Sequence, residues 1–323
     1  MQITDFGQTS AGDVVQCVKI SAGQLQADIL TLGATLRHVG LNGVAHSLTL
    51  GSETVSDYEG KMQYFGALVG PVANRIAAAK TTLHGKSLQF DPNENGNLLH
   101  GGRIGLHHKI WTVARLAPDS VTLSLSLPDG EFGWPGTRAI TAVFSILPPA
   151  TLRLIITATT DAPSLLNVAN HSYWNLDGTD NWLGHSLQIA ADHILPVDAA
   201  LLPTGEIAPV ADTPFDLRTG TRLIQGHPPL DTNFCLAPAK AALRKVAVLT
   251  GASGITMTIA TTEPGLQIYD GQRTARPGKT PYEGIAIEPQ GWPDAPNHAN
   301  FPSVEIAPDK PYAQTTEWHF TTP

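Results

Sequence analysis

The chain has few of the residues that would mark several common protein classes. Its 323 residues include only two cysteines, Cys17 and Cys235, too few for the disulfide framework of a small secreted domain. We therefore expect both to be reduced and to serve as small core residues. The first residues also lack a basic segment followed by an apolar one. For that reason we expect no secretory signal and a cytoplasmic protein.

Positive charge is also scarce, with 20 Lys and Arg against 28 Asp and Glu and a formal net charge of −8. Nucleic acids and anionic membranes require concentrated positive charge, so we expect neither as a partner. No apolar run approaches the roughly 18 to 20 residues that a membrane helix needs. The composition favours a small neutral molecule as the partner, and we expect a monomer or a weak homodimer.

The sequence is rich in patterns typical of β-strands. In 121–127 apolar residues alternate strictly with Ser or Thr, which predicts a half-buried strand. Further strands are predicted at 14–20, 25–32, 152–159 and 255–261, and the 30 Gly and 25 Pro fall between such runs. No segment of a dozen residues has a clean helical stripe. We therefore predict a mostly β protein, an antiparallel β-sandwich forming one domain over 1–323.

Two titratable residues stand beside polar or apolar groups that suit proton transfer. His171 lies in Asn170-His171-Ser172-Tyr173, where neighbouring groups could fix its tautomer, although an isolated histidine is more often structural. Glu288 follows the apolar run 284–287, so we expect it where a buried strand emerges, with a raised pKa suited to a general base. A carboxylate that caps the end of a strand is the alternative.

Two further residues have equally open interpretations. His100 precedes Gly101 and Gly102, which permit either close approach to a ligand or an ordinary turn with an exposed histidine. Arg75 is a permanent cation with several donors, and such a residue most often forms a surface ion pair.

Several motifs together resemble the aldose 1-epimerase, or galactose mutarotase, family, and they occur in the family's order between about residues 66 and 301. They are Ala73-Asn74-Arg75-Ile76, Asn97-Leu98-Leu99-His100-Gly101-Gly102, Asn170-His171-Ser172-Tyr173-Trp174-Asn175-Leu176, Pro229-Leu230-Asp231, Pro264-Gly265-Leu266-Gln267 and Glu288-Pro289-Gln290-Gly291-Trp292-Pro293-Asp294. The resemblance implies a galactose mutarotase-like supersandwich with a sugar cleft on one concave sheet.

The same resemblance implies an activity and a set of site residues. The activity is interconversion of the α and β anomers of a neutral free aldose, a hexose or pentose, without a cofactor. Glu288 would be the catalytic base and His171 the acid on the ring oxygen. The implied substrate-binding residues are Asn74, Arg75, His100, Asp231 and Gln267.

Departures from the family pattern at Pro71, Thr232 and Gln272 leave the preferred sugar open among galactose, glucose, xylose and arabinose. A non-catalytic carbohydrate-binding protein on the same fold is one alternative. A hexose-6-phosphate 1-epimerase is another, but it would need clustered cations for the phosphate. Arg75 is the only clear cleft arginine in the sequence, unless Arg103 also faces the cleft.

No metal site is expected, although the chain has 12 histidines. They are scattered along the sequence. The one adjacent pair, His107 and His108, would point to opposite faces of a strand and could not chelate one ion together.

Overall fold

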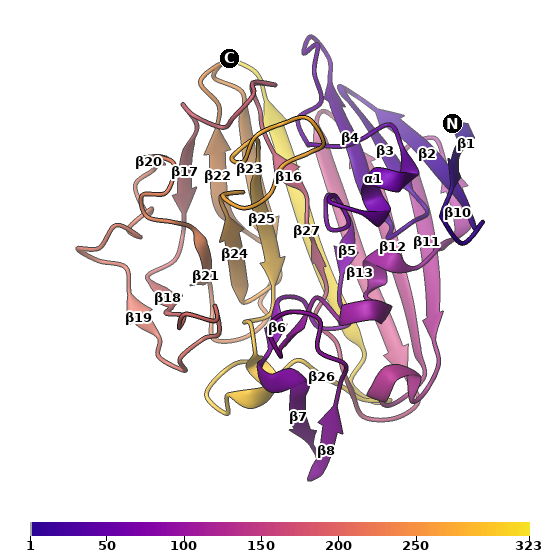
Figure 1. Ribbon diagram of the computed structural model, residues 1–323. Helices are drawn as coiled ribbons and strands as arrows, with labels where there is room; N and C mark the ends of the chain where they lie inside the picture. Colours follow the sequence, from indigo (N-terminus) through magenta and orange to yellow (C-terminus); the bar gives the residue numbers. More distant parts are fainter. Residues whose placement is uncertain (1) are drawn as a thin grey trace.

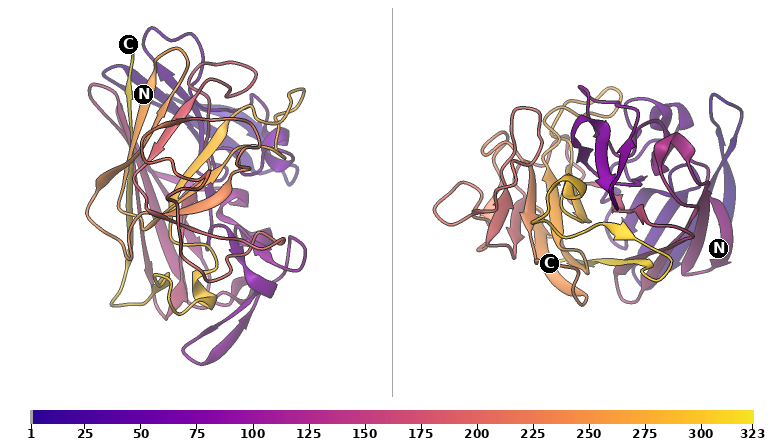
Figure 2. Two further views of the ribbon diagram at one scale, coloured as in Figure 1. Left: turned by 90° about the vertical axis from the view of Figure 1, so that its left-hand side faces the viewer. Right: turned by 90° about the horizontal axis from the view of Figure 1, so that it is seen from below.

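The computed structural model describes residues 2–323 and has two layers of β-sheet (Figures 1 and 2). One layer is a continuous nine-stranded antiparallel sheet. Its strands, in spatial order, are β10 (Thr112–Ala117), β11 (Ser120–Leu127), β12 (Arg138–Leu147), β13 (Thr151–Thr160), β27 (Tyr312–Thr321), β23 (Thr256–Thr261), β22 (Arg244–Thr250), β17 (Ser186–Ile189) and β20 (Thr221–Arg222).

The second layer consists of two smaller antiparallel sheets. One has six strands, in the order β16 (Tyr173–Trp174), β25 (Ile285–Gln290), β24 (Gly265–Tyr269), β21 (Asp231–Cys235), β18 (His193–Leu195) and β19 (Ala208–Pro209). The other has four, β1 (Gln2–Gln8), β2 (Val14–Ala22), β3 (Leu25–Leu30) and β4 (Thr35–Leu41). In Figure 1 they lie in front of opposite halves of the nine-stranded sheet.

Short paired strands and turns complete the chain. The two-stranded pairs are β5 (Leu68–Val69) with β15 (Ala169–Asn170), β6 (Arg75–Ile76) with β9 (Leu98–Leu99), β7 (Lys80–Leu83) with β8 (Lys86–Gln89), and β14 (Ser164–Leu165) with β26 (Glu305–Ile306). Helical structure is limited to α1 (Val55–Glu59) and the 3-10 turns η1 (Ala77–Ala79), η2 (Gly102–Ile104), η3 (Leu106–His108), η4 (Glu131–Gly133) and η5 (Ala295–Asn297) within residues 2–323. The β7–β8 hairpin projects from the body (Figure 1).

The prediction of a mostly β, antiparallel sandwich is confirmed. Each predicted strand has a counterpart with ends within two residues of those expected, namely β2, β3, β11, β13 and β23. In β11, Val121 and Leu123 are fully buried while Ser126 is exposed, as the alternation requires. Cys17 is a buried free thiol, and Cys235 is half-buried and also free.

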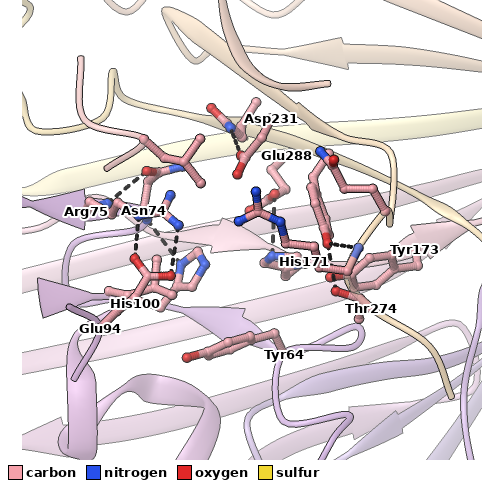
Figure 3. Close-up of a pocket in the computed structure, with 16 residues that line it drawn as sticks. Tyr64, Asn74, Arg75, Glu94, His100, His171, Tyr173, Asp231, Thr274 and Glu288 are labelled. Atoms are coloured by element: carbon pink, nitrogen blue, oxygen red, sulfur yellow. Dashed lines mark hydrogen bonds and ion pairs between the residues drawn. The ribbon is translucent and has the colours of Figure 1, made fainter. Parts of the chain in front are cut away.

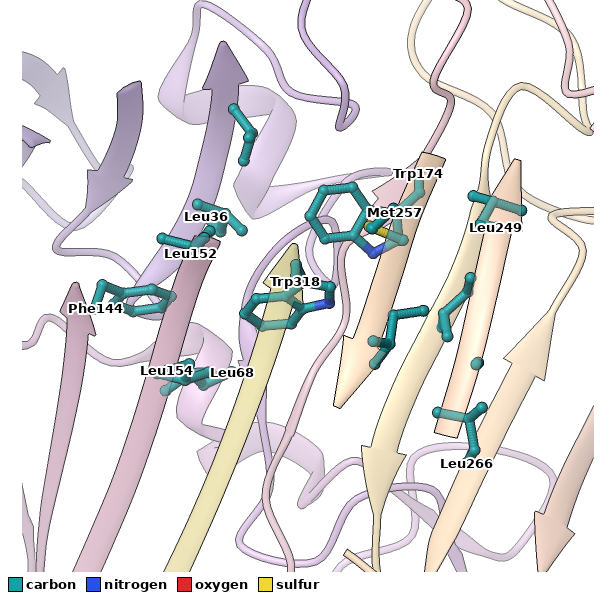
Figure 4. Close-up of a cluster of buried hydrophobic side chains, with 14 of the residues drawn as sticks. Leu36, Leu68, Phe144, Leu152, Leu154, Trp174, Leu249, Met257, Leu266 and Trp318 are labelled. Atoms are coloured by element: carbon teal, nitrogen blue, oxygen red, sulfur yellow. The ribbon is translucent and has the colours of Figure 1, made fainter. Parts of the chain in front are cut away.

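The hydrophobic core lies between the two layers. Trp318 of the nine-stranded sheet lies against Trp174 of the six-stranded sheet, with ring centroids 5.7 Å apart, and Met257 and Leu266 belong to the same fully buried cluster (Figure 4). Burial of one such side chain contributes roughly 1.5–3 kcal/mol relative to exposure. This core therefore stabilises the packing of the six-stranded sheet against its larger neighbour.

Strand alternation then decides which side chains of the six-stranded sheet face away from the core. In β25, Ile285 and Ile287 point into the core, so Glu288 between Ile287 and Pro289 points to the opposite face. In β24, Leu266 and Ile268 occupy the core and Gln267 takes the outer face. The outer face of this sheet is thus polar where its inner face is apolar.

Candidate functional site

A cavity of about 230 Å³ lies on the outer face of the six-stranded sheet, and all seven predicted site residues line it (Figure 3). Pockets for drug-sized ligands span roughly 300–1,000 Å³, so a space of this size suits a single small ring. The seven are Asn74, Arg75, His100, His171, Asp231, Gln267 and Glu288. The other lining residues are Tyr64, Glu94, Leu99, Tyr173, Leu201, Tyr269, Gln272, Arg273 and Thr274.

Three neighbouring strands supply the floor of the cavity. Gln267 of β24 lies directly opposite Glu288 of β25, and β21 begins with Asp231 on the other side of β24. The Gln267 amide donates a hydrogen bond from Nε2 to Asp231 Oδ1 over 2.7 Å. Because all three side chains stand on the same face of adjacent strands, pairing within the sheet fixes their spacing.

His171 is held in place through its backbone. It follows β15, whose residues pair with β5, and its N–H donates to the carbonyl of Ala67 over 2.9 Å. Its own carbonyl accepts from the N–H of Gly66 over 2.9 Å, and the Asn170 side chain donates to the Gly66 carbonyl over 2.8 Å. The imidazole is thereby aimed at the sheet, where His171 Nε2 lies 3.5 Å from Glu288 Oε1.

The opposite wall of the cavity comes from the paired strands β6 and β9. Asn74, just before β6, has a left-handed backbone with φ of 62°, a conformation that Asn adopts more readily than most residues. Its N–H donates to Nδ1 of His100 over 3.1 Å. A neutral His100 therefore carries its own proton on Nε2 and can donate it to a ligand.

Burial dominates the protonation of the site. It raises the pKa of Glu288 well above its usual value, and the nearby charge of Asp231 raises it further, whereas Arg75 lowers it. Burial also raises the pKa of Asp231 and lowers that of His171 to about 4. In all three groups burial disfavours the charged form. Burial thus favours the protonated form of Glu288 and the neutral form of His171.

A family model described as aldose 1-epimerase matches residues 16–319. The chain belongs to the aldose 1-epimerase family. It is 36% identical to the galactose mutarotase of Mus musculus over 98% of both chains, and 31% identical to the aldose 1-epimerase of Escherichia coli K12 over 90% of this chain and 91% of that one.

Solved structures agree with this assignment. An aldose epimerase homologue from C. elegans superposes with a TM-score of 0.87 at 32% identity, covering 95% of this chain and 98% of that chain. A galactose 1-epimerase from Lactobacillus acidophilus also gives a TM-score of 0.87, at 25% identity, covering 99% of this chain and 98% of that chain. The resemblance of the motifs to this family is confirmed.

Tyr64 is a lining residue that sequence reasoning missed, and it contacts both histidines of the cavity. Its ring is stacked with His171, with centroids 5.8 Å apart, and lies 4.8 Å from His100. Burial raises the pKa of Tyr64 to about 12, so it stays a neutral hydroxyl. Tyr64 lies two residues before Gly66. The backbone hydrogen bond between Gly66 and His171 is the only feature that would have indicated the position of Tyr64 in the site.

Three details of the sequence reasoning were wrong. Glu288 does not end a strand, because β25 continues to Gln290 and the carboxylate lies within the sheet, 2% exposed. His107 and His108 are in the 3-10 turn η3 rather than a strand, and their rings lie 3.9 Å apart on one side. Arg75 is not the only arginine at the cleft, since Arg273 also lines it, whereas Arg103 lines a separate small pocket.

The remaining alternatives for single residues are decided by burial. His100 is 5% exposed, so it is not an exposed turn histidine. Arg75 does form an ion pair, with Glu94, but the pair lines the cavity and Arg75 is 7% exposed.

Within residues 2–323, no cluster of three or more His, Cys, Asp or Glu side chains has the arrangement needed to hold a metal ion. The described part of the chain also contains no helix long and apolar enough to cross a membrane.

Proposed function

We propose that this chain is an aldose 1-epimerase that interconverts the α and β anomers of a neutral monosaccharide, with Glu288 as base and His171 as acid. The observation that carries the proposal is the 3.5 Å separation of His171 Nε2 and Glu288 Oε1 inside the cavity. The anomeric hydroxyl and the ring oxygen of an aldose are bonded to the same carbon. Two groups this close together can reach both oxygens at once.

In ring opening, Glu288 removes the proton of the anomeric hydroxyl while His171 donates a proton to the ring oxygen. The bond between C1 and the ring oxygen breaks, and C1 becomes an aldehyde. Rotation about the C1–C2 bond then exposes its other face. In closure His171 takes the proton back and Glu288 returns one to the new hydroxyl, as microscopic reversibility requires.

The protonation of the buried pair is consistent with these roles. Burial favours the tautomer in which Glu288 holds the proton and His171 is neutral. The reactive tautomer, with Glu288 ionised and His171 protonated, contains the same single proton. The pair therefore becomes reactive by moving one proton internally, and needs neither gain nor loss of a proton from solvent.

The remaining five site residues hold the sugar in this proposal. Asp231 and Gln267 present oxygen atoms from the sheet, and His100 presents an N–H from the opposite wall. Arg75 and Asn74 complete that wall. Groups of this kind match sugar hydroxyls, which both donate and accept hydrogen bonds.

We further propose that the enzyme works without a cofactor or metal, because ring opening and closure involve no net oxidation and no group transfer. The same proposal includes a single domain spanning 1–323 and a cytoplasmic location. It also includes a monomer or weak homodimer without nucleic acid or membrane partners. The acidic composition supports the last of these.

A hexose 6-phosphate is a less suitable substrate. Arg75 is engaged by Glu94, and the cavity also contains the carboxyl groups of Asp231 and Glu288. A phosphate dianion would be placed among acidic groups, with only Arg273 at the rim as a second lining arginine. A non-catalytic sugar-binding protein, in turn, would have no need of a buried acid and base in contact.

Polarimetry tests the proposal directly. Freshly dissolved α-galactose, α-glucose, α-xylose and arabinose are followed to equilibrium with and without the protein. We expect the optical rotation to relax faster for at least one sugar. Binding of a sugar without any acceleration of its relaxation would contradict the proposal and support the non-catalytic alternative.

A further inference from the structure

Arg75, the cationic side chain in the wall of the cavity, is held by the carboxylate of Glu94, which has no part in the proposed mechanism. Glu94 Oε2 lies 2.5 Å from Arg75 Nε, and Glu94 Oε1 lies 2.9 Å from Arg75 Nη2. This two-point contact is the geometry with which a guanidinium also binds the carboxylate or phosphate of a ligand. Both residues line the cavity, as Figure 3 shows.

Glu94 is fixed in this position by a tight turn. The N–H of Glu94 donates to the carbonyl of Asn97 over 3.1 Å, and the N–H of Asn97 donates to the carbonyl of Glu94 over 2.8 Å. The Asn97 side chain accepts from the N–H of Ala78 over 2.9 Å, which ties the turn to the segment after β6. The carboxylate is therefore presented by a braced turn.

The two partners of this ion pair differ in their exposure to solvent. The Arg75 side chain is 8% exposed, whereas that of Glu94 is 28% exposed and lies on the solvent side. Two of the guanidinium nitrogens, Nε and Nη2, already face a carboxylate that is nearer to solvent than they are. An anion binding these nitrogens would have to displace Glu94 while passing near the carboxyl groups of Asp231 and Glu288.

We propose that Glu94 is a specificity-determining residue that restricts the cavity to neutral sugars, by occupying the edge of Arg75 that would otherwise bind an anionic group. Neutral hydroxyls remain compatible with the site because they can accept from the donors of Arg75 that Glu94 leaves free. The inference rests on the proposed function for the identity of the neutral ligand. The exclusion of anions rests only on the ion pair between Arg75 and Glu94.

The test compares a Glu94→Gln variant with the unaltered protein. Glutamine keeps the size of the side chain and one acceptor for Arg75 but removes the negative charge. Calorimetric titration measures the dissociation constants of inorganic phosphate and of galactose. Phosphate is the first probe because it can approach Arg75 whatever the orientation of a sugar ring, and galactose 6-phosphate is the second.

We expect Glu94→Gln to bind phosphate and galactose 6-phosphate at least about tenfold more tightly, since a hydrogen bond between charged groups becomes available. The dissociation constant of galactose should change less than about threefold. Glu317→Gln is the matched control, because Glu317 also pairs with an arginine, Arg153, but lies in β27 of the other sheet. It should leave all three constants unchanged.

A ratio of phosphate to galactose affinity within about twofold of the original in Glu94→Gln would overturn the inference. An equal gain in Glu317→Gln would do the same, because it would reveal an effect of net charge alone. If Glu94→Gln does not fold, Glu94→Asp replaces it: the shorter side chain should loosen the pair and give an intermediate gain. No gain in that variant would also overturn the inference. Failure of the proposed function shows separately, as absent acceleration in polarimetry.

Discussion

The two faces of the six-stranded sheet differ sharply, although the same strands form both. The inner face of β24 and β25 presents Leu266, Ile268, Ile285 and Ile287, all fully buried in the core. The outer face of these strands presents Gln267 and Glu288, which are as deeply buried but polar. The difference shows that strand alternation alone can place a reaction site on the back of a hydrophobic core.

Several polar atoms on the outer face also lack hydrogen-bond partners. Among the described residues, Gln267 Oε1, Glu288 Oε2 and both amide atoms of Asn233 have no hydrogen-bond partner in the protein. Buried polar groups without partners destabilise the fold. The inner face thus supplies the stability that allows an unfavourable outer face to persist, a division common at functional sites.

The largest expected effect comes from the outer face. Glu288→Gln keeps the shape of the side chain but removes the base, so kcat should fall by about 10²–10⁴. Galactose binding should change little, because the amide still offers hydrogen bonds. Polarimetry measures the rate, and calorimetry measures binding. A variant retaining kcat within about threefold of the original would refute the assignment of Glu288 as base.

A change on the inner face of the same strand should act on stability and leave the chemistry intact. Ile287→Ala removes a fully buried side chain from the core, so the free energy of unfolding should fall by about 2–5 kcal/mol. Denaturation in urea measures the loss. The kcat of the folded fraction should stay within about threefold of the original. If this variant lost activity as steeply as Glu288→Gln, the separation of the two faces would be wrong.

A milder effect is expected at Asp231, at the margin of the polar face. Asp231 accepts a hydrogen bond from Gln267 and faces the cavity, so Asp231→Asn removes a charged acceptor for sugar hydroxyls. We expect KM to rise about threefold to tenfold with kcat nearly unchanged. Initial rates over a range of galactose concentrations separate the two constants. A selective fall in kcat would instead give Asp231 a part in proton transfer.

The sequence predicted the apolar faces of strands better than the polar outer face of the six-stranded sheet. The alternation of apolar and polar residues in 121–127 was sufficient to identify a half-buried strand, because packing of this kind is local. The continuation of β25 through Pro289 to Gln290 was missed because the apolar run that predicted the strand stops at Ile287. Proline is tolerated there since β16 pairs only with Ile285 and Ala286, so β25 has a neighbouring strand on one side only at that point.

On the outer face, the predicted residues came from motifs, and the missed ones came from contacts between distant segments. Glu94 lies 19 residues from Arg75, and no local pattern indicates that a turn will bring the two together. Tyr64 reaches His171 only because Gly66 binds the backbone of that histidine. Arg273 likewise depends on the path of the loop after β24. Such pairings follow from tertiary structure, which the alternation of residues does not encode.

The smallest expected effect tests whether the outer face destabilises the fold. Burial raises the pKa of Glu288 in the folded state, so between its unfolded pKa and that raised value the folded protein binds more protons than the unfolded one. Its contribution to stability is therefore complete at low pH and is lost as the pH rises. Glu288→Gln removes this dependence. Relative to the original protein, the variant should gain stability as the pH rises from about 5 to about 7, by at most about 1.4 kcal/mol per pH unit, measured by urea denaturation. If the difference in unfolding free energy between the variant and the original protein stays constant or narrows over this range, the folded site already accommodates the charged carboxylate. The outer face would then destabilise the fold less than its burial indicates.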